Sequence, residues 1–240
     1  MREHDVKQNT PEWEMMRAGI PTASAFDHIV TPTGKLSKQA RDYKAWLLAE
    51  RIMRAPIPTA KTSFMDRGTA YEAEAVEFYS LVSGKDTKRI GFVTTDDGLI
   101  GASPDRWSGA DGQVEIKVPA INTHMSYYLA QCVLDRVSSA IENPPEDAAA
   151  LKKLQEEYKE AVSNSIAHEY RVQTMGQLWV TERQWADLLS YSPESLPPVL
   201  VHLKRDTAFI EILGQSVSEF SRQLEEEAAA LVKAGIISQD

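Results

Sequence analysis

Ser103-Pro104-Asp105, followed after a short gap by Val114-Glu115-Ile116-Lys117-Val118, is the most informative pair of segments in this sequence. Successive side chains of a strand point to opposite faces. The three apolar residues of the second segment are therefore expected in the core, while Glu115 and Lys117 emerge together on the other face. Asp105, at the end of the preceding strand, comes beside Glu115 when the chain returns. Two neighbouring carboxylates suit hard divalent cations with oxygen ligands, so these residues predict a metal site.

A divalent ion at such a site has a defined chemistry. Mg²⁺ lowers the pKa of bound water and polarises a phosphodiester, and two ions about 4 Å apart hold both the attacking and the leaving oxygen. Lys117 beside them could orient the water or offset charge in the transition state. The motif is short, however, and an exposed hairpin that happens to carry Asp, Glu and Lys would show the same spacing.

The sequence around this motif alternates between helical and strand patterns, which indicates an α/β fold. Three short strands at 89–94, 99–103 and 113–118 are expected to form a meander. Strand pattern returns at 199–204, and 185–190 fits either a strand or a helix. Helical patterns cover 11–17, with Thr10 as its cap, a short stretch after Thr22 or Ser24, and then 37–54, 66–84, 123–140, 146–162, 165–180 and 216–234.

The helix expected over 37–54 is amphipathic. Lys44, Arg51 and Arg54 lie on one face and are expected to point away from the core. The opposite face, expected in the core, carries Ala45, Leu48, Ala49, Ile52 and Met53.

The composition is that of a folded protein of one domain, with 240 residues, 42% hydrophobic and 25% charged. No apolar run approaches the roughly 18 residues of a membrane span, and the first nine residues are polar, so the sequence predicts a cytosolic protein without a secretory signal. The single cysteine, Cys132, cannot form an internal disulfide and is expected in the core.

The charge is unevenly distributed along the chain, whose formal net charge is -9. Residues 1–140 hold 17 basic and 18 acidic side chains, whereas residues 141–240 hold 9 and 17. Segment 31–67 is basic, with a net charge of +5. The acidic total argues against a passive nucleic-acid coat. The basic segment is either an ordinary solvated helix face or an anion-binding face.

Six ordered motifs together resemble a known family, the lambda-type, YqaJ-like viral exonucleases, which have a PD-(D/E)xK nuclease core. Besides the two segments quoted above, the matching positions are Trp13, the run Arg17-x-Gly19-Ile20-x-Thr22-Ala23-Ser24, Gly68-x-x-Tyr71-Glu72, and Tyr170-x-x-Gln173 leading into Trp179-Val180-Thr181. The resemblance implies a restriction-endonuclease-like fold, a central mixed β-sheet flanked by helices. It also implies a homotrimeric ring that degrades one strand of linear duplex DNA from its 5′ end.

The resemblance also implies roles for individual residues. It makes Asp105, Glu115 and the main-chain carbonyl of Ile116 the metal ligands, for two Mg²⁺ ions with Mn²⁺ as a substitute. It also implies three catalytic residues. Lys117 and Gln173 would position the attacking water, and Glu72 would supply a further acid near the metals. The residues that would hold the 5′-terminal phosphate are Arg17, Ser24 and Ser103, and a guanidinium suits this because it makes bidentate bonds to phosphate oxygens. Without the resemblance, Gln173 and Glu72 would be ordinary helix-surface residues, Arg17 a surface cation, and the two serines a cap and a turn.

The sequence departs from the family pattern in two places. Where a relative has a further arginine past the motif lysine, this chain has Asn122-Thr123-His124, so His124 is a candidate substitute in the phosphate pocket. The stretch from about 144 to 162 resembles a helical insertion without an assigned role. Met65 stands where an apolar wedge that separates the strands is expected, with core packing as the alternative. Lys35 and Lys44 of the basic segment are further candidates for DNA contact.

These observations predict a single nuclease domain over 1–240, with a helical part at 10–84, a catalytic sheet core at 88–120, the insertion and a C-terminal helix at 216–234. The predicted function is a Mg²⁺-dependent 5′→3′ exonuclease for double-stranded DNA ends, encoded by a phage or prophage and acting in the bacterial cytosol, with no membrane partner. It would leave 3′ single strands for an annealing protein. A restriction or repair endonuclease, an inactive DNA-end-binding module and an unrelated α/β domain are the alternatives.

Overall fold

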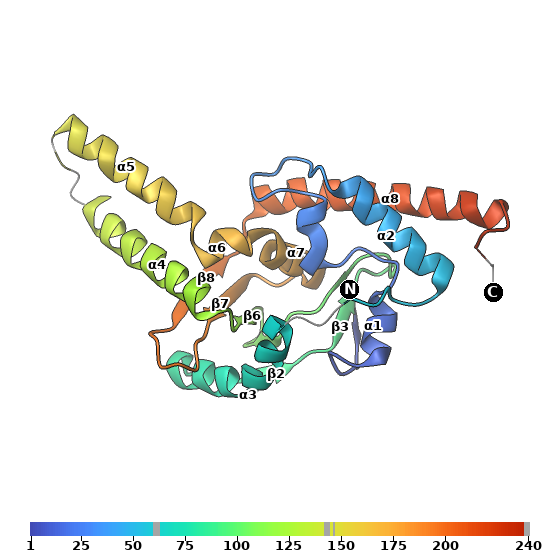
Figure 1. Ribbon diagram of the computed structural model, residues 1–240, viewed down its shortest axis with the longest axis horizontal. Helices are drawn as coiled ribbons and strands as arrows, with labels where there is room; N and C mark the ends of the chain where they lie inside the picture. The colour runs from blue at the N-terminus through green and yellow to red at the C-terminus, as the bar shows by residue number, and fades with distance from the viewer. Residues whose placement is uncertain (60–62, 142–144, 146, 238–240) are drawn as a thin grey trace.

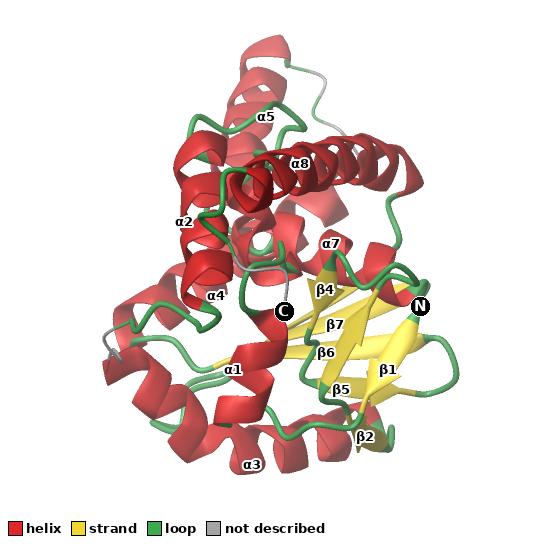
Figure 2. Cartoon of the chain, turned by 90° about the vertical axis from the view of Figure 1, so that its right-hand side faces the viewer, coloured by secondary structure: helices red, strands yellow, loops and turns green. Residues whose placement is uncertain are grey.

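The computed structural model describes residues 1–59, 63–141, 145 and 147–237, without the side chains of 63–65 and 141. Two sheets form its centre (Figure 2). The strands are β1 (Arg2–His4), β2 (Thr87–Arg89), β3 (Phe92–Thr94), β4 (Gly101–Ala102), β5 (Arg106–Ser108), β6 (Gly112–Lys117), β7 (Trp185–Ser190) and β8 (Val199–Lys204). The helices are α1 (Pro11–Arg17), the 3₁₀ helix η1 (Ala23–His28), α2 (Ala40–Met53), α3 (Ser63–Ser83), α4 (Ile121–Ile141), α5 (Ala148–Ser163), α6 (Ile166–Glu169), α7 (Arg171–Thr181) and α8 (Thr207–Lys233).

The larger sheet has five strands in the order β2-β5-β6-β7-β8. The β6 and β7 strands run parallel and their other neighbours are antiparallel, so the sheet is mixed, as expected. Alternation along β6 sends Val114 toward Tyr79 of α3 and sends Gln113 toward Gln177 of α7. Helix α3 thus covers one face of the sheet and α7 the other (Figure 2).

The predicted three-strand meander is wrong, because its strands do not share one sheet: β3 and β4 pair antiparallel as predicted, but β6 lies in the larger sheet. The chain also changes sheets at Gly91. Strand β2 pairs with β5 in the larger sheet, whereas β3 joins β1 and β4 in a separate three-stranded sheet. A Cβ atom at Gly91 would lie 2.1 Å from the carbonyl oxygen of Val6, so the main chain passes there at a distance that only glycine permits. The strand expected over 89–94 is therefore two strands.

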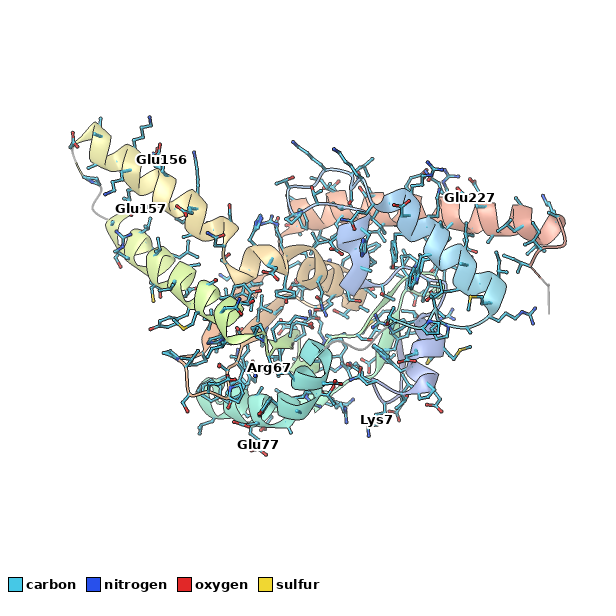
Figure 3. All side chains as sticks on the ribbon, in the orientation of Figure 1. Lys7, Arg67, Glu77, Glu156, Glu157 and Glu227 are labelled. Atoms are coloured by element: carbon cyan, nitrogen blue, oxygen red, sulfur yellow. The ribbon has the colours of Figure 1, made fainter. Side chains whose placement is uncertain are left out.

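Helix α2 buries a face that is rotated from the predicted one, so that Leu48 packs against the core as predicted but other residues of that face do not. Its buried residues are Leu47 and Glu50, whereas Ile52 and Met53 are 44% and 53% exposed. The α8 helix packs beside α2 and supplies carboxylates that attract the basic residues: Lys44 Nζ pairs with Glu227, and Figure 3 shows Glu227 on α8 alongside α2. The prediction that Lys44 and Arg51 point away from the fold is therefore wrong, and both face a neighbouring helix.

The C-terminal helix is longer than predicted. It begins at Thr207 rather than at 216, and the side chain of Asp206 caps it by accepting a hydrogen bond from the Phe209 N–H at 3.0 Å. The ambiguous segment 185–190 is strand β7, whose pairing with both neighbours settles its conformation.

Helices α4 and α5 form an arm that projects from the rest of the molecule (Figure 1), with Glu156 and Glu157 on α5 (Figure 3). The α5 helix covers most of the expected insertion, and among its residues Ala161 is buried. Cys132 on α4 is exposed, so its prediction as a core residue is wrong. None of the helices in the described ranges combines the length and apolar character that crossing a membrane requires.

Candidate active site

The pairing of β5 with β6 brings the two predicted acidic ligands together. Arg106 is opposite Val114 in this antiparallel pair, which places Asp105, immediately before β5, beside Glu115. The Asp105 Oδ2 accepts a hydrogen bond from the Ile116 N–H at 2.6 Å. The expected proximity is confirmed, but Asp105 precedes the partner strand rather than ending the strand before it.

Three side-chain donors hold the Glu115 carboxylate, which is only 3% exposed. Lys117 Nζ lies 2.7 Å and Gln173 Nε2 lies 2.6 Å from Oε1. Gln177 Nε2 lies 2.7 Å from the other oxygen, Oε2. The structure thus brings together Glu115 and Lys117 of β6, which share a face as predicted, with Gln173 of α7.

Gln177 is the residue of this cluster that the sequence analysis missed. Its amide is oriented from behind by Gln113, whose Nε2 donates to Gln177 Oε1 at 2.9 Å, and both side chains are almost fully buried. The signal was present in the sequence. Gln173 and Gln177 are four residues apart on one helix face, while Gln113 and Glu115 are two apart on one strand face.

The buried charges in this cluster shift the pKa values of its members. Burial, and then the charge of Glu115, raise the pKa of Asp105 to about 8, against the opposing effect of Lys117. For Lys117, burial lowers the pKa, but the charges of Glu115 and Asp105 outweigh it, so the pKa is raised. The ring of Tyr170 also lies against this ammonium, at 4.5 Å.

Glu72 of α3 lies near this cluster, and its charge contributes to the raised pKa of Asp105. The Glu72 carboxylate accepts a hydrogen bond from Arg106 Nη2 at 3.2 Å and is partly exposed. It is therefore close to the acidic pair, with an arginine already bound to it.

The donor set suits a hard divalent ion. In the described part of the chain, no group of three or more His, Cys, Asp or Glu side chains is arranged to hold a metal. The available donors are the carboxylates of Asp105 and Glu115 and the main-chain carbonyl of Ile116 between the strand's two charged residues. Mg²⁺ is commonly held by one or two carboxylates and keeps several waters. Burial, and after it the charge of Glu115, raise the pKa of Asp105, and a bound cation would offset the repulsion between these two carboxylates.

The residues predicted to bind the 5′ phosphate form one connected group. Arg17 Nη2 donates to Ser24 Oγ at 2.9 Å, and the Arg17 guanidinium lies 4.0 Å from the centre of the Trp13 ring. Trp13 Nε1 in turn donates to Ser103 Oγ at 2.9 Å. Burial lowers the pKa of Arg17, while Tyr43 and nearby glutamates including Glu115 act in the opposite direction.

A cavity of about 560 Å³ opens beside this group. Its lining combines the Arg17 and Ser24 side chains with Trp13 and with residues of α2 and of the loop that follows it. Arg17 and Ser24, two of the three residues predicted to bind the 5′ phosphate, therefore line a hollow that is large enough for more than a phosphate group.

The residues predicted to contact DNA differ in how accessible they are. His124 is fully buried, and its two ring nitrogens bond to Ser190 Oγ and the Pro197 carbonyl, so its prediction as a phosphate-pocket residue is wrong. Lys44 is held by Glu227 of α8, whereas Lys35 is exposed. The Met65 side chain lies outside the described residues.

The chain resembles known nucleases in sequence and in structure. The family model of the YqaJ-like viral recombinase domain matches residues 12–184. An alkaline exonuclease, LHK-Exo from Laribacter hongkongensis, superimposes with a TM-score of 0.68 and 26% identity over 94% of this chain and 98% of its own. Its structure in complex with dAMP gives the same values.

A phage related exonuclease from Haemophilus somnus 129PT has the same fold, with a TM-score of 0.58 and 14% identity over 87% of this chain and 96% of its own. A search of curated proteins gives no match. The comparisons confirm the fold and the family resemblance expected from the motifs. Because the family model spans 173 of the 240 residues, from 12 to 184, this chain belongs to the YqaJ-like viral recombinase domain family.

Proposed function

We propose that this protein is a Mg²⁺-dependent exonuclease that removes the 5′ strand from the ends of linear double-stranded DNA. The observation that carries the proposal is the cluster of Asp105, just before β5, with Glu115 and Lys117 of β6 and Gln173 of α7. Glu115 is buried in it and the other three are partly exposed. Membership of the family and the likeness to an alkaline exonuclease over nearly the whole chain support the same activity.

Each residue of the cluster has a chemical task in this proposal. Asp105, Glu115 and the Ile116 carbonyl would hold the metal, which supplies Lewis-acid polarisation of the scissile phosphate and a water of lowered pKa. Lys117 stays protonated, since its pKa is raised, and so its ammonium orients the attacking water and offsets charge on the phosphate. The Gln173 side chain directs its amide N–H at Glu115 and keeps the carboxylate in place.

The preference for 5′-phosphorylated ends is assigned to the Arg17 group, the connected residues Arg17, Ser24, Trp13 and Ser103. The Arg17 guanidinium and the hydroxyls of Ser24 and Ser103 would bind the terminal 5′ phosphate, because planar N–H donors match phosphate oxygens. Binding of the 5′ phosphate at one end of the cavity would determine which of the two strands enters the metal site. In this proposal the shortened duplex carries a 3′ single strand.

The wider role follows the resemblance to lambda-type exonucleases. Three copies would form a ring around the duplex, and the 3′ strand would pass to a single-strand annealing protein during phage-type recombination. The host cytosol is the compartment in which that reaction would take place.

Digestion of DNA labelled separately at each end tests the proposal. We expect progressive loss of the 5′ strand from linear duplex in Mg²⁺ or Mn²⁺, none in EDTA, none from a closed circle, and none with Lys117→Ala. Cutting of the closed circle would instead identify an endonuclease. No cutting with either metal would leave a DNA-end-binding module.

A further inference from the structure

We infer that Glu50 and Arg51 of α2 clamp Gly19 by binding its N–H and its carbonyl group, and that this clamp sets the preference for 5′-phosphorylated ends. They act as positioning residues for Arg17 and Ser24. This inference rests on the proposed role of Arg17 in binding the terminal phosphate.

The clamp consists of two hydrogen bonds to one residue of the turn between α1 and η1. The Gly19 N–H donates to Glu50 Oε2 at 2.8 Å, and the Gly19 carbonyl accepts from Arg51 Nε at 2.7 Å. Gly19 lies between Arg17 and Ser24 in the chain, with φ of +74°. Consecutive residues of one helix therefore hold both polar groups of the residue that connects the two predicted phosphate ligands.

Glu50 also ties together the other walls of the cavity. Its second oxygen, Oε1, accepts hydrogen bonds from Trp46 Nε1 and from the Ile57 N–H, each at 3.1 Å. The residue is only 8% exposed, and among the described residues no cation forms an ion pair with it. A buried carboxylate is costly unless its oxygens are bonded, so three N–H groups from three segments are drawn to one point.

The position of the Gly19 peptide against α2 is tightly defined. A Cβ atom at Gly19 would lie 2.6 Å from Arg51 Cγ, so the turn approaches the helix more closely than any other residue allows. Arg51 is fixed from the other side, because its Nη2 pairs with Glu225 of α8 at 2.5 Å. The turn thus rests on a side chain that is itself anchored.

This arrangement affects phosphate binding more than cleavage. Arg17 Nη2 reaches Ser24 Oγ at 2.9 Å only while the turn between them keeps its course. If the turn relaxes, the guanidinium and the hydroxyl no longer converge on one phosphate. Glu115, Lys117 and Gln173 belong to β6 and α7 and keep their contacts.

Steady-state digestion of matched 5′-phosphate and 5′-hydroxyl duplexes tests the clamp. We expect Glu50→Gln and Arg51→Met to raise KM for phosphorylated ends about tenfold, the scale of one lost hydrogen bond to a charged group, with kcat and 5′-hydroxyl digestion unchanged. Glu226→Gln is the matched control, since it removes an ion pair of α8 with Arg222 but leaves the contacts of Glu50 and Arg51, and it should keep the preference. Thermal unfolding of each variant checks that the fold is intact.

Arg17→Ala separates the two proposals. If it abolishes the preference while folded Glu50→Gln and Arg51→Met retain it, the clamp is overturned and the phosphate pocket stands. If Arg17→Ala leaves the preference unchanged, the pocket assignment fails and the clamp fails with it. If Glu50→Gln does not fold, Trp46→Phe replaces it, since this change removes one hydrogen-bond donor to the Glu50 carboxylate. The clamp is overturned if both Trp46→Phe and Arg51→Met keep the preference for phosphorylated ends.

Discussion

The carboxylate of Glu115 shows how single residues build the site. Lys117 and Gln173 bond to one of its oxygens and Gln177 to the other, so its orientation is fixed before any ligand arrives. Gln177 is in turn fixed by Gln113. If Glu115 binds the proposed metal, the groups that orient its carboxylate should also affect metal affinity, as the hydrogen-bond partners of metal ligands commonly do.

We expect Gln177→Leu to weaken Mn²⁺ binding by about 10-fold or more, because Glu115 loses the donor to Oε2 and gains freedom to rotate. Isothermal titration calorimetry of the purified protein measures this directly. Gln131→Leu, a change to a partly exposed glutamine on α4, is the matched control and should bind Mn²⁺ as the unaltered chain does. Equal affinities of the two variants would remove Gln177 from the site.

Glu115→Gln should abolish cleavage and retain duplex binding. The substitution removes a charged metal ligand but keeps the shape of the side chain, and the Arg17 group is untouched. Cleavage and gel-shift assays on the same duplex separate the two effects. Residual cleavage at the original rate would show that Glu115 is not a ligand.

Metal affinity should rise with pH up to about 8, because the ion binds the deprotonated form of Asp105, whose pKa is raised to about 8 by burial and by Glu115. In the absence of metal, the stability of the fold has the opposite dependence on pH. The folded state holds this proton more tightly than the unfolded chain, so the free energy of unfolding falls as pH rises toward about 8. Mn²⁺ titrations between pH 6 and 9 provide the test. Glu72→Gln should move the midpoint to lower pH, since the Glu72 charge contributes to the shift, and a flat profile would contradict the prediction.

At the scale of elements, α7 links the two parts of the site. The face of α7 that packs on the sheet carries Gln173 and Gln177, and its other side packs on η1, which carries Ser24. Gly176 makes this packing close, because a Cβ atom there would lie 2.5 Å from the Phe26 ring. The helix and η1 are therefore in close contact at this point.

Gly176→Ala should destabilise the protein by about 1–3 kcal/mol, since the new methyl group overlaps a fully buried ring. Gly68→Ala on α3 is the opposite case, with no atom within 4 Å of the added Cβ, and should stabilise by about 0.5–1 kcal/mol through the gain in helix propensity. Urea unfolding compares the two. The packing argument would be wrong if both substitutions changed the free energy of unfolding in the same direction.

For the whole molecule, the distribution of charge has a structural explanation. The acidic C-terminal helix α8 crosses α2 (Figure 1), and its carboxylates pair with the basic segment through Lys44–Glu227 and Arg51–Glu225. Part of the +5 charge of segment 31–67, for which a solvated helix face and an anion-binding face were the alternatives, is thereby neutralised within the chain. Of the named basic candidates, Lys35 remains exposed.

Three copies of the 26.8 kDa chain should sediment together at about 80 kDa if the proposed ring forms. Sedimentation velocity at several protein concentrations measures this. A mass that stays at that of one chain would contradict the trimer and would leave the exonuclease proposal to be judged on its own assay.

The sequence by itself determined the local features. Thr10 caps α1 as expected, Glu115 and Lys117 share a face of β6, and the ordered motifs identify the family. Caps and alternation depend on residues only a few positions apart, so they are visible in the sequence. The same holds for the carboxylate pair, since a short return of the chain places Asp105 at Glu115.

Only the tertiary structure decided which element covers each face. The split of the strand at Gly91, the burial of His124, the pairing of Arg51 with α8 and the contact of Gln177 with Glu115 all join segments that are distant in the chain. Periodicity specifies that a face is polar or apolar, but its partner is selected by long-range packing and by the need of each buried polar group for a bonded neighbour.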